Sequence, residues 1–479
     1  MTTTTTRVPA RSAVLRYGTA WRDATPPVGI YHRFWGAANH DTATGVHRPI
    51  RVSATAIGPR DSAAGTWLLL SSDHCILRAD DMARLRASVE AAVELPEGSH
   101  IAFSFGHSHS AGHICSERSS QPGGAMIGPY LDQLRLAAAE AVCEALSSMQ
   151  DARALFAVGQ SGMAAHRDFR DPATGEYVCG FNPDSQWDLP VHMARFQSPE
   201  GADLGCLVSY PCHPTTLAWG NTELSPDYIG ALRETVESTS SGPCHFLLAP
   251  CGDIGPRHGY VGDTAVADSN GRQLGHAALE AWHSLDHVEG DFVYRGPVLS
   301  GATLGEWTYA GWDDAGSEFS HRRYTVELPY RDDLRSVSDI DRELERWAEA
   351  AQGVNTDKPD RAGQARAMAE RLRRERERVA PLPAGDVYPF EYNIIRMGPV
   401  ALVLVEGEPY YELQVLLQDA LPGQTVIVGV LSEGSRCSYL PTADAYDREL
   451  YQVHVSVLAS SCLETLASAI ISQLHDTFS

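Results

Sequence analysis

Residues 100–110 of this chain are HIAFSFGHSHS, a stretch that joins a predicted strand to a polar loop. The run HIAFSF is short, apolar and aromatic, which is typical of a buried strand. Gly106 then marks a turn, and His107, Ser108 and His109 follow it directly. In open α/β sheets, ligands bind just beyond the carboxyl ends of the strands. We therefore expect His107 and His109 to lie at a ligand-binding edge of a sheet.

Four other apolar runs end in the same way, each in a short loop that contains an ionisable side chain. They are GCLVSY before Pro211-Cys212-His213-Pro214, CHFLLAP before Cys251-Gly252-Asp253, PVALVLV before Glu406-Gly407-Glu408-Pro409, and QTVIVGV before a loop with Cys437, Ser438 and Tyr439. Further strand-like runs are TWLLLSS and ARALFAV, and helical patterns such as ADDMARLRASVEAAVE and YLDQLRLAAAEAVCEALSSM lie between the strands. This alternation predicts an α/β domain in which both faces of the sheet are covered.

Residues that are distant in the chain can converge at such an edge, and four of them have donor groups suited to zinc. His107 and His213 offer imidazole nitrogens, Glu408 offers a carboxylate and Tyr439 a phenol. Imidazole and carboxylate suit this ion, and a catalytic zinc site keeps one position open for water. Each residue also has an ordinary structural interpretation, as a hydrogen-bonded histidine, a helix-capping glutamate or a half-buried tyrosine. The residues alone leave both interpretations open.

The composition argues against several classes of partner. The chain has 479 residues, 43% of them hydrophobic, and a formal net charge of −23, so neither a nucleic-acid backbone nor an anionic membrane surface is an expected partner. No run approaches the roughly 18 apolar residues that span a bilayer, and the N-terminus MTTTTTRVPARSA lacks the apolar segment of a secretory signal. We therefore expect a cytoplasmic protein without a stable membrane anchor. The ten cysteines form no CxxC pair, which argues against a cysteine-rich zinc ribbon.

The domain organisation that we expect is a disordered tail over residues 1–14 and a single domain over residues 15–479. Within that domain, residues 338–379 form a charged excursion with two predicted helices, SDIDRELERWAEAA and DRAGQARAMAERLRRERERV, separated by GVNTDKP. The second helix is so polar that only a thin apolar stripe can be buried. The favoured interpretation is a solvated helical excursion, and the alternative is a basic binding helix.

A series of segments, in order and over most of the chain, resembles the catalytic domain of the neutral/alkaline non-lysosomal ceramidase family. TPPVGIYHRFWGA and TGVHRPIRVSA are similar to its opening segment and first strand, and SSDH is similar to a strand that ends in Asp. FGHSHSAGH, SYPCHPTTLAWGNTELSPDYIGAL and APCGDIGPR are similar to its two His loops and its Gly-Asp loop. EGEPYYELQVLLQ and SYLPTADAYDRELYQV resemble its two late motifs. The resemblance implies a large mixed-sheet α/β catalytic domain of the neutral ceramidase type.

Position by position, the resemblance implies a site for one zinc ion held by His107, His213, Glu408 and Tyr439. It implies that His109 and Tyr451 line the reaction centre. Arg167 lies where the family has an arginine that helps to hold the substrate carbonyl, although Arg170 is close by in the sequence. Asp253 would lie behind the ligands or in the cavity wall. The implied activity is hydrolysis of an amide by a metal-activated water, with His109 moving the proton.

Two departures from the family bear on the substrate. Gly255 occupies the position of the serine that ceramidases have in their Gly-Asp-x-Ser-Pro loop, and the chain ends soon after the Tyr451 motif, before the immunoglobulin-like domain of ceramidases. We therefore expect a zinc-dependent hydrolase for a small-molecule acyl amide that is smaller or more polar than ceramide. The alternatives are an enzyme that forms an amide or lactam, or cleaves an ester, at the same zinc site; a cysteine hydrolase that uses Cys212 or Cys251; and a non-catalytic zinc-binding protein.

Overall fold

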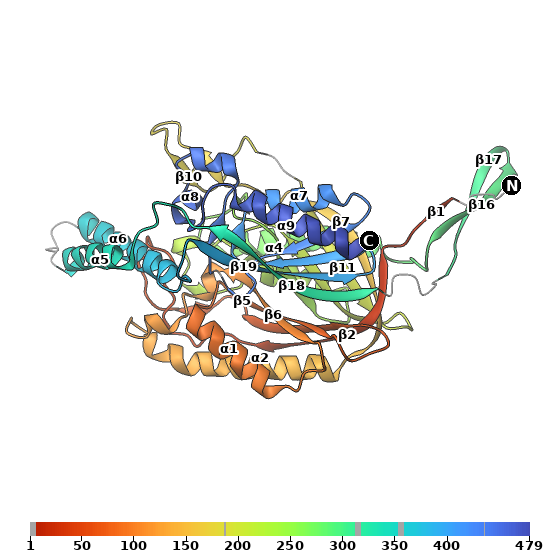
Figure 1. Cartoon of the computed structure of the whole chain (residues 1–479), viewed down its shortest axis with the longest axis horizontal. Helices are drawn as coiled ribbons and strands as arrows, with labels where there is room; N and C mark the ends of the chain where they lie inside the picture. Colours follow the sequence, from red (N-terminus) through yellow and green to blue (C-terminus); the bar gives the residue numbers. More distant parts are fainter. Residues whose placement is uncertain (1–5, 186–187, 312–317, 353–358, 435) are drawn as a thin grey trace.

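The computed structural model describes residues 6–185, 188–311, 318–352, 359–434 and 436–479. Within them, the largest element is a mixed sheet of eight strands in the order β14-β12-β11-β7-β2-β4-β5-β6 (Figure 1). These strands are β2 (Ser12–Asp23), β4 (Arg51–Gly58), β5 (Trp67–His74), β6 (His100–Ser108), β7 (Gln150–Ser161), β11 (Leu189–Gln197), β12 (Asp203–Tyr210) and β14 (Cys244–Leu248). The two edge pairs, β12 with β14 and β5 with β6, are parallel, and the pairs between them are antiparallel.

A second, smaller sheet packs against the large one. Its strands are β18 (Phe319–Pro329), β19 (Val387–Met397), β20 (Val400–Val405) and β22 (Thr425–Gly429), of which only β20 and β22 pair in parallel. Trp67 and Phe196 of the large sheet and Ile395 and Leu402 of the small one are nearly fully buried in one apolar cluster. All seven apolar runs predicted to be strands are strands, and they supply β5, β6, β7, β12, β14, β20 and β22.

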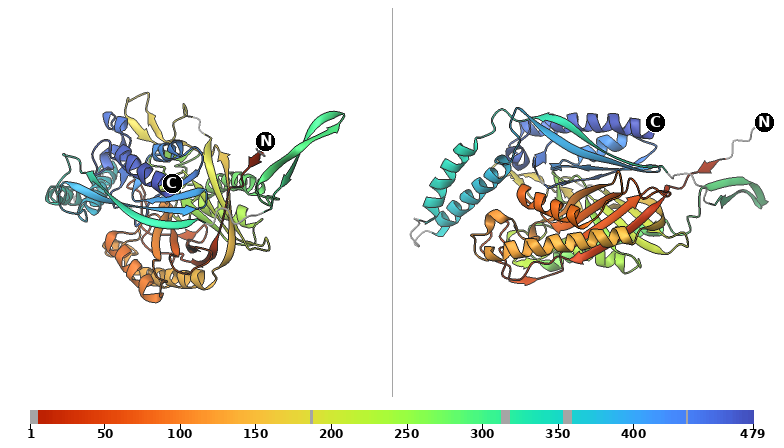
Figure 2. Two further views of the ribbon diagram at one scale, coloured as in Figure 1. Left: turned by 45° about the vertical axis from the view of Figure 1, so that its right-hand side comes forward. Right: turned by 60° about the horizontal axis from the view of Figure 1, so that its bottom comes forward.

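Helices cover the outer face of each sheet, which gives four layers (Figure 2). The large sheet is covered by α1 (Ala79–Ala92), α2 (Ile127–Ser147), α3 (Tyr228–Glu237) and α4 (Thr264–His283). The small sheet is covered by α7 (Glu412–Ala420) and α9 (Cys462–Phe478). The predicted α/β class with a large mixed sheet is confirmed. Each sheet has helices on one face only, however, because the other face is buried against the other sheet.

The charged excursion consists of two helices, α5 (Val337–Gln352) and α6 (Pro359–Val379), as predicted. The solvated interpretation is wrong for one face of α6. Glu370 on this helix accepts two hydrogen bonds, of 2.9 and 3.0 Å, from the guanidinium of Arg118, and the two side chains are only 5% and 2% exposed. Beside them, Ala365, Ala369 and Leu372 form the thin buried stripe. A buried ion pair therefore docks α6 on the main body.

The N-terminal boundary differs from the prediction. Strand β2 begins at Ser12, and Ala13 and Leu15 are each 1% exposed in the cluster between the sheets, so the predicted tail ends too late. Residues 1–5 of that tail lie outside the described residues. Nearby, β1 (Arg7–Val8) pairs with β16 (Phe292–Ser300), which forms with β17 (Ala302–Tyr309) an arm that projects from the body (Figure 1). Among the described residues, no helix has the length and apolar character needed to cross a bilayer.

Candidate metal centre

Two histidines lie at the carboxyl ends of strands in the large sheet. His107 is the penultimate residue of β6, where its φ of 66° turns the chain out of the strand, and His213 follows β12 in the next loop. Each ring donates from Nδ1 to a backbone carbonyl at 2.8 Å, His107 to Cys75 and His213 to Cys251. These bonds fix both rings and leave Nε2 as the atom with a lone pair, which is the usual arrangement of metal-binding histidines.

The small sheet supplies the carboxylate and the phenol. After β20 and β22 the chain forms a short parallel pair, β21 (Glu408–Pro409) and β23 (Tyr439–Leu440), in which Glu408 lies opposite Tyr439. Oε2 of Glu408 is 3.3 Å from Nε2 of His107 and 3.2 Å from Nε2 of His213. The Tyr439 hydroxyl is 3.3 Å from the same His213 nitrogen. The structure thus brings all four predicted ligands together.

The charges of this buried group fit a divalent cation. Burial acts to raise the pKa of Glu408, but His107 and His213 hold it well below its usual value. Burial acts to lower the pKa of His107, but Cys75 and Glu408 raise it well above its usual value. The pKa of His213 is lowered to about 3, first by burial and then by Arg167. Glu408 is therefore held as a carboxylate between two imidazoles, a charge arrangement that a divalent cation can occupy.

The three side chains with the tightest geometry form a candidate metal site. Ligand atoms of His107, His213 and Glu408 lie within 4.8 Å of one another, and all three residues are buried. Cys75, His107 and His109 meet the same distance limit. The first group is the stronger candidate because its carboxylate meets two imidazole nitrogens that are already oriented by backbone carbonyls.

A cavity of about 330 Å³ adjoins this group, and we call it the reaction cavity. His109, Arg167 and Tyr451 line it, as the family resemblance implies. The His109 ring lies 4.9 Å from the His107 ring and 4.3 Å from Phe34, measured between centroids. Both ring nitrogens of His109 are shielded from solvent and have no hydrogen-bond partner among the described residues. His109 is thus placed beside the candidate metal site with its nitrogens available.

Arg167, rather than Arg170, belongs to the site. Its Nε and Nη2 donate to the carbonyl of Gly252 at 3.1 and 2.6 Å, and Nη2 also donates to the Tyr439 hydroxyl at 3.1 Å. Arg170 instead donates to the carbonyl of Gly175 from an exposed position on β9 (Asp168–Arg170). Arg167 therefore orients the phenol of Tyr439 from behind.

Asp253 lies behind the candidate ligands and not in the wall of the reaction cavity. Its carboxylate accepts a hydrogen bond of 2.8 Å from the backbone of Tyr411, and its carbonyl accepts one from the backbone of Arg167. Burial raises its pKa, and His166 acts to lower it. These contacts give Asp253 a role in holding the loops that position Arg167 and Glu408.

Two nucleophile candidates can be assessed at this point. Gly255 lies in β15 (Ile254–Pro256), where an added Cβ would be 3.6 Å from the Arg167 side chain. Because glycine has no side chain, this position offers no nucleophile. Cys212 and Cys251 do not line the reaction cavity, and burial raises the pKa of both thiols well above the usual value. A protonated thiol is a poor nucleophile, so the geometry does not support the cysteine-hydrolase alternative.

The sequence did not identify most of the remaining cavity wall. The missed residues are the aromatic Phe34, Trp35, Trp219 and Tyr260 and the basic Arg78, Arg374 and Arg378. The aromatic pair in the segment YHRFWGA is the one signal that the sequence offered, because adjacent large aromatic residues in a loop need a surface to cover.

The fold and this group of side chains together define a mixed α/β protein with a candidate buried metal site. No protein-family model and no curated protein matches the chain. Two solved structures share its fold, a ceramidase complexed with C2 and the neutral ceramidase from Pseudomonas aeruginosa. Each has a TM-score of 0.65 over 96% of this chain and 74% of the other, at 12% and 14% sequence identity respectively. The chain therefore has a divergent neutral-ceramidase-like fold, as the sequence motifs predict.

Proposed function

We propose that the chain is a zinc-dependent hydrolase that cleaves an acyl amide smaller or more polar than ceramide. The observation that supports this most is the buried convergence of His107, His213 and Glu408, with both Nδ1 atoms fixed by backbone carbonyls. Structural zinc sites are closed by four strong ligands, whereas this group borders a cavity. The two similar structures are those of ceramidases, which agrees with an acyl-amide substrate.

The chain's own residues divide the chemistry among them. Tyr439 would complete the ligand set, held by its hydrogen bond from Arg167. Zinc bound there would supply Lewis-acid chemistry, lowering the pKa of a water from about 15.7 to about 7. His109 is the residue that we expect to accept the proton of the attacking water and to deliver it to the leaving nitrogen, because its ring nitrogens have no other partner among the described residues.

The developing oxyanion needs a donor, and the cavity offers two. Tyr451 is half exposed and lines the reaction cavity with its phenol ring 5.9 Å from that of Tyr439. Arg167 also lines the cavity, and its Nη1 has no hydrogen-bond partner among the described residues. Removal of one such donor typically costs about 2.7–4 kcal/mol of transition-state stabilisation.

The proposal is tested by amine release from a panel of N-acyl substrates, measured after removal of metal with a chelator and after addition of zinc. We expect activity only with zinc, about one zinc per chain by elemental analysis, and no inhibition by iodoacetamide. Glu408→Gln should lose zinc and activity, whereas Glu412→Gln, in the first turn of α7, should keep both. Amine release that continues in the metal-free protein would overturn the proposal.

A further inference from the structure

The reaction cavity concentrates positive charge in a chain whose net charge is −23. Among the described residues that line it, four are arginines, Arg78, Arg167, Arg374 and Arg378, and Glu408 is the single carboxylate. Glu408 is already occupied by the two imidazoles of the candidate metal site. The cavity is therefore suited to hold negative charge brought by a ligand.

Three of these arginines are engaged within the protein. Arg78 donates to Glu377 at 2.8 Å, and Arg374 donates to Glu370 at 3.1 Å. Arg167 is held by Gly252 and Tyr439.

Arg378 differs from the other three, because it has no hydrogen-bond or ion-pair partner in the described part of the chain. The carboxylate of Glu375, one turn earlier on α6, is paired with Arg335 at 3.2 Å. Burial lowers the pKa of Arg378, and the neighbouring charges of Arg78 and Arg374 act in the same direction. A guanidinium nevertheless stays protonated in proteins, so one that is partly buried and has no partner in the described part of the chain favours an anionic ligand.

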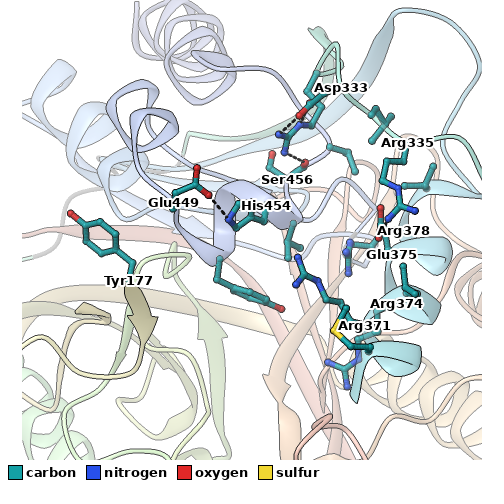
Figure 3. Close-up of a pocket in the computed structure, with 18 of the residues that line it drawn as sticks. Tyr177, Asp333, Arg335, Arg371, Arg374, Glu375, Arg378, Glu449, His454 and Ser456 are labelled. Atoms are coloured by element: carbon teal, nitrogen blue, oxygen red, sulfur yellow. Dashed lines mark hydrogen bonds and ion pairs between the residues drawn. The ribbon is translucent and has the colours of Figure 1, made fainter. Parts of the chain in front are cut away.

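Arg378 also lies where the reaction cavity meets a second cavity. A second, wider cavity of about 1420 Å³ adjoins the reaction cavity, and Arg374, Arg378, Tyr451 and Val455 line both. Figure 3 shows Arg374 and Arg378 extending from α6 on one side of this wide cavity, across from His454 and its neighbours. These two guanidinium groups can therefore contact a ligand in either cavity.

The reaction cavity is also lined by a group of aromatic side chains. Trp35 lies 5.8 Å from Tyr260 and 6.1 Å from Trp219 between ring centroids, and Phe34 lies between His109 and the guanidinium of Arg374. These rings offer apolar contact area close to His109. The cavity thus offers guanidinium groups to an anion and aromatic rings to an apolar group.

We propose that the substrate is an acyl amide that carries an anionic group, a carboxylate or a phosphate, and that Arg378 binds this group with Arg374 beside it. The aromatic side chains then contact the apolar part of the substrate, and the amide lies at the candidate metal site. This inference rests on the proposed hydrolase function and adds the substrate class.

The test uses three probes that differ only in one group: N-hexanoyl-phenylalanine, its neutral primary carboxamide, and the analogue with a phosphonate in place of the carboxylate. Binding is measured by calorimetry on the zinc-free protein, so that the metal cannot hold the anion. We expect at least one anionic probe to bind about tenfold or more tightly than the carboxamide. Arg378→Gln should abolish this preference, and Arg378→Lys should keep part of it.

Arg376→Gln is the matched control, because Arg376 is exposed on the same helix, pairs with Asp341 and lines neither cavity. It should bind all three probes as the wild type does. Equal binding of the probes, binding of none, or an anion preference that survives in a folded Arg378→Gln protein would overturn the inference.

Amine release is then measured with zinc. If the anion preference holds but no probe or N-acyl substrate is cleaved, the hydrolase proposal fails and the anion site stands. If the carboxamide is cleaved and there is no anion preference, the hydrolase proposal stands and the anion site fails.

Discussion

The ion pair between Arg118 and Glu370 should determine whether helix α6 stays docked. Glu370→Gln removes the charge and keeps the side-chain shape. The guanidinium of Arg118, which is 2% exposed, then keeps only Glu377, at 2.8 Å, as a charged partner. Arg374 loses its carboxylate partner as well. Removing one partner of a buried ion pair typically costs about 3–5 kcal/mol, and because Arg118 keeps Glu377 we expect the low end of this range. Local opening of α6 by about 3 kcal/mol corresponds to roughly 150-fold faster exchange of its amides.

Hydrogen exchange measured by mass spectrometry on peptides of α6 tests this directly. Asp341→Asn is the matched control, because it breaks another ion pair of α6, with Arg376, in which the side chains are 40% and 46% exposed. An exposed pair contributes less than about 1 kcal/mol, so exchange should change by less than roughly fivefold. The reasoning is refuted if Glu370→Gln accelerates exchange of α6 no more than Asp341→Asn does.

Three further outcomes are expected. His107→Ala should lose both zinc and activity, whereas His109→Ala should keep zinc and lose rate; elemental analysis would contradict these roles if His109→Ala emptied the site. Gly252→Ala places a Cβ 2.6 Å from the carbonyl of Glu408 and should weaken zinc binding about tenfold or more in a chelator competition, with unchanged affinity as the contrary result. Burial lowers the pKa of His192 to about 4, below its unfolded value near 6.5, so its contribution of about 3 kcal/mol is present above pH 6.5 and lost as the pH falls towards 4. His192→Gln should therefore reduce the pH dependence of the free energy of unfolding by urea in that window, and an unchanged slope would show that the residue does not contribute.

The convergence of the candidate ligand residues could be predicted because strand ends are visible in the sequence. His107 and His213 each follow an apolar run, and so does Glu408, and this pattern alone indicates that all three lie at sheet edges. The central antiparallel strands β2 and β11 were not predicted, because they mix polar and apolar residues on faces whose burial depends on the second sheet. Sheet-on-sheet packing joins segments that are hundreds of residues apart, and local periodicity does not report it.

The placement of the α6 arginines that line the reaction cavity could not be predicted, for a different reason. The sequence of α6 is polar around most of its circumference, so periodicity gives no direction for Arg374 or Arg378. What orients the helix is a set of long-range ion pairs, chiefly those of Glu370 and Glu377 with Arg118 and Arg78, which lie far earlier in the chain. A charged helix with weak amphipathicity can therefore be docked by ion pairs when it carries both carboxylates and arginines.

The candidate metal centre lies where the two sheets meet, and this position explains its chemistry. The large sheet supplies both imidazoles, through β6 and β12, and the small sheet supplies Glu408 and Tyr439, through β20 and β22. Neither sheet alone has a ligand set that suits zinc. The distances of 3.2 and 3.3 Å between imidazole and carboxylate therefore depend on how the sheets pack. Because close-packed protein interiors deform little, the packing of the sheets can keep these side chains oriented without a separate rigid loop. The surrounding loops and α6 contribute the aromatic and arginine side chains of the reaction cavity, which under the proposed function would contact the substrate.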